Sequence, residues 1–152
     1  MNKKEALSKA LSLCARQEQC RKDLLLKLSK WDVSQSDSEQ ILLTLEQEGF
    51  IDHLRYAKSF TTDKFKFNRW GRIKIRWMLR QKEIPEDIIE NALTQIDEED
   101  YENMLMVELQ KKIKTLRSES EAEKKSKLIQ FATQRGFEYE TIYKMTDKLT
   151  KE

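Results

Sequence analysis

Positively charged and aromatic side chains alternate along one stretch of the chain, residues 64–82 (KFKFNRWGRIKIRWMLRQK). The stretch holds eight Lys and Arg residues, no Asp or Glu, and four rings, at Phe65, Phe67, Trp70 and Trp77. Such cations pair with phosphate or carboxylate groups, and such rings stack on bases or fill apolar hollows in a partner. The stretch therefore predicts a surface that binds a polyanion or an acidic protein groove, and a solvated helix face is the simpler alternative.

The next stretch has the opposite charge. Residues 83–110 hold ten Asp and Glu residues and neither Lys nor Arg. The net charge of +2 gives no overall preference for nucleic acid, so any such binding must come from this local separation of charge. The acidic stretch either docks on a basic partner surface or shields the basic stretch beside it.

Residues for catalysis or metal binding are sparse. The chain has one histidine, His53, and lacks the glycine-rich phosphate-binding and dinucleotide-binding motifs. Cys14 and Cys20 fit neither a zinc site nor a redox motif, and we expect them to be small core residues. The acids 98–100 fit the first turn of a helix better than general acid–base chemistry. We therefore expect a binding protein with no enzymatic activity, cofactor or metal.

Composition favours an all-α chain. Only three Gly and one Pro are available for turns, while 37% of the residues are charged and 38% hydrophobic. No apolar run has the length of a secretory signal core or of a membrane span. We expect a cytoplasmic protein.

Short sequence patterns indicate where helices begin and end and which of their residues are buried. The chain has capping boxes at Ser36–Glu39 and Ser118–Glu121, an N-cap at Asp52 and a left-handed final residue at Gly49. Apolar residues at helical spacing predict the buried stripes, for example Ala6, Leu7, Ala10, Leu11 and Cys14 near the start, and Leu105, Val107, Leu109 and Ile113 further on. Helices over most of the chain follow from these signals.

Three segments align with one another: 27–33 (KLSKWDV), 78–84 (MLRQKEI) and 131–137 (FATQRGF). The alignment places Asp32, Glu83 and Gly136 at equivalent positions, 51 and 53 residues apart. Repeats of this length are typical of stacked helical units, each too small to bury a full core alone. We therefore predict an elongated, curved array of three tandem three-helix repeats, at 1–50, 51–97 and 98–152.

The middle of the chain resembles the RecX family, bacterial regulators of the RecA recombinase. The resemblance rests on GFIDHLRYA (49–57), GRIKIRWMLRQKEI (71–84) and IIENAL (88–93). The residues that match the family's motifs are Gly49, Asp52, Arg55, Tyr56, Ala57, Gly71, Ile73, Leu79, Lys82, Ile84, Ile89, Ala92 and Leu93. A less specific likeness extends to the opening Ala6, Leu7, Leu11 and Arg16 and to residues 135–142.

Three positions depart from the family pattern. His53 replaces an Asp, Arg72 replaces a Pro, and Glu83 replaces the usual Gly. Because Glu resists the left-handed conformation that Gly adopts readily, we expect the helix before Ile84 to end differently. Arg72 adds a charge to the basic stretch.

The resemblance implies a function. It implies three three-helix repeats lying in the groove of a RecA–DNA filament, where they restrain ATP hydrolysis, strand exchange and co-protease activity. Most family members inhibit RecA, within DNA repair, homologous recombination and the SOS response, and some also bind DNA. We expect a monomer whose partners are the RecA filament and, more weakly or indirectly, DNA, with no membrane partner. The alternative is a DNA-binding helical module that competes with the recombinase for single strands.

Helical spacing divides the basic stretch into two faces. At about 100° per residue, one face holds Ile75, Met78, Leu79 and Lys82, and the other holds Ile73, Arg76, Trp77 and Arg80. The second face either contacts the partner or packs inside the array with Trp77 in the core. We predict that the residues contacting the filament or its DNA are Arg69, Arg72, Lys74, Arg76, Trp77, Arg80 and Lys82.

Four motif residues outside this stretch fit a structural role: Arg16, Asp52, Arg55 and Tyr56. We expect Arg55 to pair with a carboxylate and Tyr56 to be buried between units. A further cluster, at Lys111, Lys112, Lys114 and Arg117, fits a solvated face better than a binding site.

Overall fold

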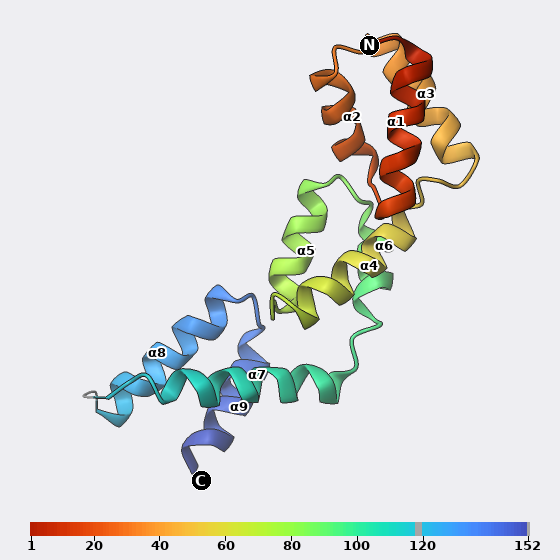
Figure 1. Ribbon diagram of the computed structural model, residues 1–152. Helices are drawn as coiled ribbons and strands as arrows, with labels where there is room; N and C mark the ends of the chain where they lie inside the picture. The colour runs from red at the N-terminus through yellow and green to blue at the C-terminus, as the bar shows by residue number, and fades with distance from the viewer. Residues whose placement is uncertain (118–119, 152) are drawn as a thin grey trace. The chain divides into compact units, whose positions relative to one another are not determined.

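The protein is all-α. The computed structural model describes residues 1–117 and 120–151, which contain nine helices and no strand (Figure 1). In chain order the helices are α1 (Lys3–Arg16), α2 (Arg21–Lys30), α3 (Gln35–Gln47), α4 (His53–Lys66), α5 (Arg72–Gln81), α6 (Glu86–Leu93), α7 (Glu98–Ile113), α8 (Glu121–Gln134) and α9 (Tyr139–Lys151). Three consecutive trios, α1–α3, α4–α6 and α7–α9, form the three-helix repeats.

The first helix of each trio starts in the same way. Asn2, Asp52 and Asp97 each accept the backbone N–H three residues further on, at 2.8, 3.0 and 3.1 Å. A side-chain oxygen there satisfies one of the N–H groups that a helix start leaves unpaired. The N-cap predicted at Asp52 is confirmed.

Two other helix starts differ from the sequence expectation. The N-cap of α3 is Ser34, which accepts the backbone N–H of Asp37 at 3.1 Å, so the box predicted from Ser36 is wrong by two residues. Ser120 caps α8. Ser118, which we had expected to begin the capping box there, lies outside the described residues.

The second helix of each trio ends in a shared turn. Asp32, Glu83 and Gly136 have φ values of 57°, 60° and 91°. In each case the next N–H donates to the carbonyl five residues back, at 3.0–3.2 Å, which closes a Schellman turn. The residues that follow, Val33, Ile84 and Phe137, are buried. The repeat alignment is therefore confirmed at the backbone, and the different ending expected at Glu83 is wrong, because the turn holds Glu83 in the left-handed conformation.

Contacts between residues divide the chain into two compact units. Unit 1 is Met1–Phe60 with Leu79–Ala92, and unit 2 is Thr61–Met78 with Leu93–Glu152. The divisions fall inside α4, inside α5 and just before the last residue of α6, so each unit joins one terminal trio to part of the middle one. The predicted repeat limits, 50/51 and 97/98, stay a prediction about domains.

The core of unit 1 lies among α1, α2 and α3. α3 packs against both α1 and α2. The buried residues of this core are Ala6, Ala10, Leu24, Leu28, Val33, Ile41, Leu42, Leu45 and Ile51. Cys20 is also buried and Cys14 is half-buried, and both thiols are free. The apolar stripe predicted along the first helix is confirmed at Ala6 and Ala10.

In unit 2, helices α7, α8 and α9 pack against one another. The buried residues of these helices and of the adjoining turn include Tyr101, Leu105, Leu109, Leu128, Ala132, Phe137, Ile142 and Met145. Val107 was expected in this core but is 41% exposed. Its position two residues from both Leu105 and Leu109 turns it away from their side of α7.

Candidate partner-binding surface

Helix α5 has one buried and one exposed face. Ile75 and Leu79 are fully buried, whereas Ile73 is 48% exposed and Trp77 is 56% exposed. The faces lie as the helical spacing predicts, and the alternative that places Trp77 in the core is wrong. A large ring and a branched side chain, one turn apart, thus lie in contact with water.

Two arginines flank the exposed ring along α5. Arg76 precedes Trp77, and Arg80 follows it by three residues on the same face. Arg80 makes two hydrogen bonds to the Glu86 carboxylate, Nε–Oε1 at 2.5 Å and Nη2–Oε2 at 3.1 Å, with its side chain half exposed. Because this pair is exposed to solvent, it contributes little stability, and a partner carboxylate or phosphate can replace Glu86. We call Ile73, Arg76, Trp77 and Arg80 the α5 face.

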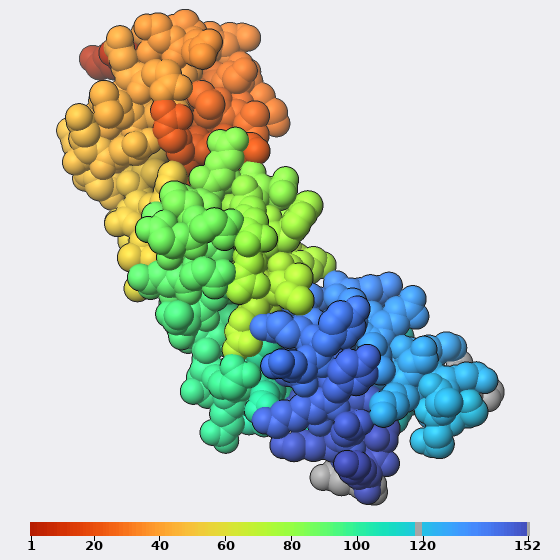
Figure 2. Space-filling model, turned by 180° about the vertical axis from the view of Figure 1, so that it is seen from behind, coloured from red at the N-terminus to blue at the C-terminus, as the bar shows by residue number. Residues whose placement is uncertain are grey.

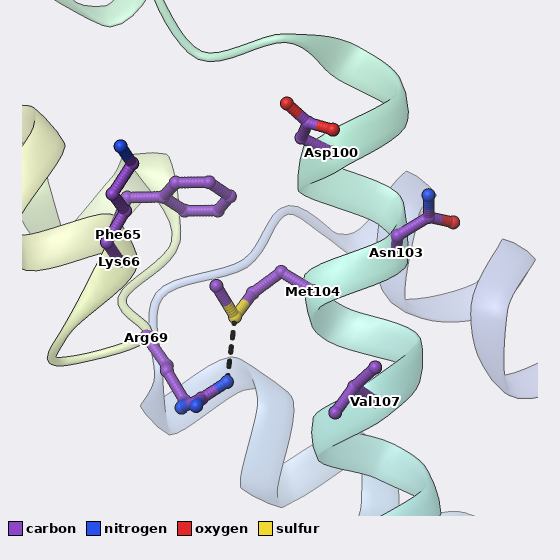
Figure 3. A pocket seen from close by; sticks show the side chains of 7 residues that line it. All are labelled: Phe65, Lys66, Arg69, Asp100, Asn103, Met104 and Val107. Carbon is purple, nitrogen blue, oxygen red and sulfur yellow. Dashed lines mark hydrogen bonds between the residues drawn. The ribbon is translucent and has the colours of Figure 1, made fainter.

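Arg69 belongs to unit 2 and forms an ion pair with another residue of that unit. Its Nε is 3.0 Å from Oε1 of Glu108, a buried residue on α7, and its Nη1 donates to the Met104 sulfur at 3.3 Å. Arg69 and Met104 line an open pocket of about 340 Å³ between the end of α4 and α7, and Figure 3 shows the hydrogen bond between them. The pocket is lined by Phe65, Lys66, Arg69, Asp100, Asn103, Met104 and Val107. Glu108 neutralises the Arg69 charge, so Arg69 here stabilises α7.

Arg72 forms the centre of a partly buried polar network. Its guanidinium pairs with Glu98 and with Glu138, the latter at 2.9 Å, and lies 3.9 Å from the centre of the Tyr101 ring. Its backbone N–H donates to the Tyr101 hydroxyl at 2.9 Å, and that hydroxyl donates to Glu138. The network joins the start of α5 to α7 and to the start of α9.

Electrostatics in this network favour the charged pair. Burial alone would raise the pKa of Glu138, but hydrogen bonds from Tyr101 and Arg72 outweigh it and hold that pKa below its ordinary value. Burial raises the pKa of Tyr101, and the bond to Glu138 raises it further. Tyr101 therefore stays protonated and keeps donating to an ionised Glu138.

The two lysines of the predicted site have different surroundings. Lys74 lies with its Nζ 4.5 Å from the centre of the Trp70 ring, and Lys64 lies 5.2 Å from the same ring. Lys82 belongs to unit 1, where its Nζ is 2.8 Å from Oδ1 of Asp23 and both side chains are half-buried. Arg69, Arg72 and Lys82 thus have internal partners, and their role in partner binding stays a prediction.

Two motif residues of α4, Arg55 and Tyr56, contact other parts of unit 1. Arg55 Nε lies 2.6 Å from Oε2 of Glu18, and its Nη2 donates to the Gly49 carbonyl at 3.0 Å. Tyr56 is buried, and burial together with the neighbouring Cys20 thiol raises its pKa. Arg16 is exposed in the last turn of α1.

Three acids complete these contacts without any signal in the sequence. Glu98, Glu108 and Glu138 belong to helices or turns distant in sequence from the arginines that they bind. Within residues 1–117 and 120–151 no group of three His, Cys, Asp or Glu residues could hold a metal ion. None of the helices described is long and apolar enough to span a membrane.

Comparison with known proteins identifies the family. Models of the second and third three-helix domains of RecX match residues 52–93 and 98–145. A regulatory protein RecX from Chlorobaculum tepidum is 34% identical over 140 residues, which cover 92% of this chain and 85% of the relative. The chain belongs to the RecX family. A RecX from Prosthecochloris aestuarii is 31% identical and covers 96% of this chain and 94% of its own.

The fold agrees with this assignment. A crystal structure of a regulatory protein RecX superposes with a TM-score of 0.87 at 28% identity, over 95% of this chain and 71% of that one. The matched RecX domains contain α4–α6 and most of α7–α9. The family resemblance and the all-α repeat fold predicted from the sequence are therefore confirmed.

Proposed function

We propose that this RecX-family protein is a non-enzymatic modulator of RecA and acts as an inhibitor. It binds the groove of the RecA–DNA filament and restrains ATP hydrolysis, strand exchange and co-protease activity. The observation that carries the proposal is the α5 face, where Trp77 is exposed between Arg76 and Arg80 and Ile73 is exposed one turn before Trp77. Trp and Arg are the residues that contribute most often to the energetic centre of a protein interface.

The α5 face suits a surface that is acidic around an apolar hollow. Covering Trp77 and Ile73 removes apolar area from water, and the guanidinium groups pair with carboxylates or phosphates at its edge. Arg69 and Arg72, through their ion pairs with Glu108 and Glu138, also hold the end of α4 and the start of α5 in place. A protein bound across neighbouring RecA subunits in this way restrains the subunit motion that accompanies ATP turnover.

The test is RecA's DNA-dependent ATP hydrolysis, measured with this protein far below the DNA concentration. We expect inhibition by the natural protein and roughly tenfold weaker inhibition by Trp77→Ala and by the pair Arg76→Glu/Arg80→Glu. Tyr139→Ala removes an equally exposed ring from α9 and is the matched control. Equal inhibition by all four proteins would exclude the α5 face as the contact.

Stoichiometry separates this function from competition for single strands. A competitor must cover the DNA, so its effect disappears at substoichiometric amounts and returns near saturation. A filament modulator acts at low occupancy. Inhibition only near saturation would contradict the proposed mechanism.

A further inference from the structure

The pocket between the end of α4 and α7 has no role in the proposed function. None of the seven described residues that line it belongs to the α5 face. Figure 3 shows side chains from the end of α4 on one side of the pocket and side chains from α7 on the other. Figure 2 shows part of α7, in blue-green, at the surface of unit 2 beside α9 in darker blue. The pocket is therefore an open hollow within one unit.

The wall of this pocket is largely apolar. Val107 is 41% exposed, Met104 is half-buried, and the buried Phe65 ring contributes an edge. Arg69 brings no net charge to the hollow, because Glu108 pairs with it at 3.0 Å. A hollow of about 340 Å³ with such a lining accepts an apolar side chain better than a charged one.

An exposed ring follows this pocket wall directly in the chain. Phe67 comes just after the lining residues Phe65 and Lys66, and at 77% it is the most exposed large apolar side chain among the described residues. Its N–H donates to the Asp63 carbonyl at 2.8 Å, which continues the last turn of α4 and fixes the backbone there. Because Phe67 is two residues from Phe65, its side chain points away from the pocket of its own chain. The ring is thus placed to enter a hollow on another molecule.

The rim of the pocket carries one charge of each sign. Lys66 and Asp100 are both exposed, and both also line a neighbouring pocket of about 260 Å³. Within residues 1–117 and 120–151, neither forms an ion pair with the other or with a third side chain. Asp100 disfavours a polyanion and Lys66 disfavours a polycation. The rim therefore suits a partner that offers an acid and a base beside an apolar side chain.

The simplest alternative is that these residues are ordinary scattered surface, since single exposed apolar side chains are normal in soluble proteins. That explanation does not account for their grouping. A ring lies beside a hollow that could hold a ring, and a cation lies beside an anion. A two-fold contact requires such a patch, because each residue of one copy meets a complementary residue of the other, and the same pair recurs with the copies exchanged.

We propose that a second copy of this chain occupies the pocket and forms a two-fold dimer. Phe67 of each copy enters the pocket of the other copy, and Lys66 of each pairs with Asp100 of the other. Two rings and two exposed ion pairs make a small contact, so the dissociation constant is on the order of 50 μM. The chain is then a monomer in dilute solution and a dimer above that concentration. The inference is independent of RecA, since it concerns this chain alone.

The first experiment is sedimentation velocity of the full chain between about 5 and 500 μM. We expect the weight-average mass to rise from 18.2 kDa towards twice that value. For Phe67→Ala we expect the dissociation constant to rise about thirtyfold, because each dimer loses two buried rings. A natural protein that stays at 18.2 kDa throughout would overturn the proposal, and so would unchanged association of Phe67→Ala.

A matched control removes an exposed ring elsewhere. Trp77→Ala truncates the 56% exposed ring of the α5 face, and we expect its dissociation constant to stay within about twofold of the natural value. Equal weakening by Trp77→Ala and Phe67→Ala would overturn the proposal, because association would then come from general surface hydrophobicity. Circular dichroism checks that each variant keeps its helix content.

Two charge reversals test the two-fold geometry. Lys66→Asp and Asp100→Lys each create two like-charged contacts in their own dimer, and we expect about tenfold weaker self-association for each. In an equimolar mixture the two variants form a dimer with opposite charges at both contacts, which should associate within about threefold of the natural protein. If two folded variants associate no better together than apart, Lys66 does not meet Asp100 of the second copy and the proposal fails.

Discussion

In both units the start of a helix packs against the turn between two helices of the next trio, and we call each such contact a junction. The two junctions are held by different kinds of contact. In unit 2, the start of α5 meets the α8–α9 turn through its backbone: the Gly71 N–H donates to the Arg135 carbonyl at 2.7 Å, and the Ile73 N–H donates to Gly136 at 2.9 Å. A Cβ on Gly71 would lie 2.3 Å from the Gly136 oxygen. We call this contact the second junction, and it depends on Gly71 having no side chain.

In unit 1, the start of α2 meets the α5–α6 turn through charged side chains. Lys22 Nζ donates to the Gln81 carbonyl at 2.8 Å, and Lys82 pairs with Asp23 at 2.8 Å. Lys22 also lies 3.9 Å from Glu83, whose side chain is mostly exposed. This first junction uses long, partly solvated groups, so salt weakens it and substitutions are tolerated.

The difference shows that junctions at equivalent positions in a repeat can be stabilised by different kinds of interaction. Where two backbones are already in van der Waals contact, adding one methyl group causes a clash and a large loss of stability. Exposed ion pairs lose only a small part of their energy when a partner is changed or salt is added. We expect the second junction to be the more sensitive one.

The largest effect is expected from Gly71→Ala. The added methyl group collides with the Gly136 carbonyl, and we expect unit 2 to lose about 3 kcal/mol of unfolding free energy. Gly49→Ala is the control, because its Cβ meets nothing within 4 Å and only its φ of +77° is unfavourable, at about 1 kcal/mol. Urea denaturation measures both, and equal losses would show that the close approach is relaxed at little cost.

Tyr101→Phe tests the polar network beside the second junction. It leaves the Arg72 N–H without its acceptor and removes a donor from Glu138, so we expect a loss of about 2 kcal/mol. Tyr56→Phe makes the same change in unit 1, beside a thiol, and we expect about 1 kcal/mol. The reverse order in thermal or chemical denaturation would contradict the comparison.

Glu83→Gly should make the first junction resemble the second. Glycine adopts φ near 60° without the cost that Glu incurs, and the Lys22 contact at 3.9 Å contributes little. We expect stability to rise by about 1 kcal/mol, seen as a higher Tm. A lower Tm would mean that the exposed Glu83 side chain matters more than its backbone conformation.

The smallest effect is expected from Asp23→Asn. This change breaks the pair with Lys82 and should cost about 0.5 kcal/mol at low salt. In about 1 M NaCl, where the Debye length is about 3 Å, the variant and the natural protein should become equally stable. A difference that persists at high salt would indicate that the pair is held by burial.

Much of the fold could be predicted because the repeats share local signals. Asp32, Glu83 and Gly136 align in the sequence, and all three have positive φ. The capping box at Ser36 was wrong because Ser34 with Asp37 fits the same pattern two residues earlier. Glu83 was misjudged because a buried residue on its C-terminal side, Ile84, fixes the turn despite the cost to Glu.

The site could be predicted only in part. Helical spacing placed Trp77 and Ile73 on one face, and both are exposed. The same stretch gave no sign that Arg72 would be enclosed, because its partners Glu98 and Glu138 lie 26 and 66 residues away in the chain. Charge counts identify a basic stretch, but the fold decides which of its charges reach solvent.

The division inside α4 and α5 has a consequence for synthesis on the ribosome. Unit 1 is complete in sequence once Ala92 has emerged, so α1–α3 can pack while the last trio is still untranslated. Thr61–Met78 belongs to unit 2, and its buried Phe65 stacks on Tyr101, a residue made later. During that interval the basic stretch, with its exposed rings, leaves the ribosome before the residues that fold against it.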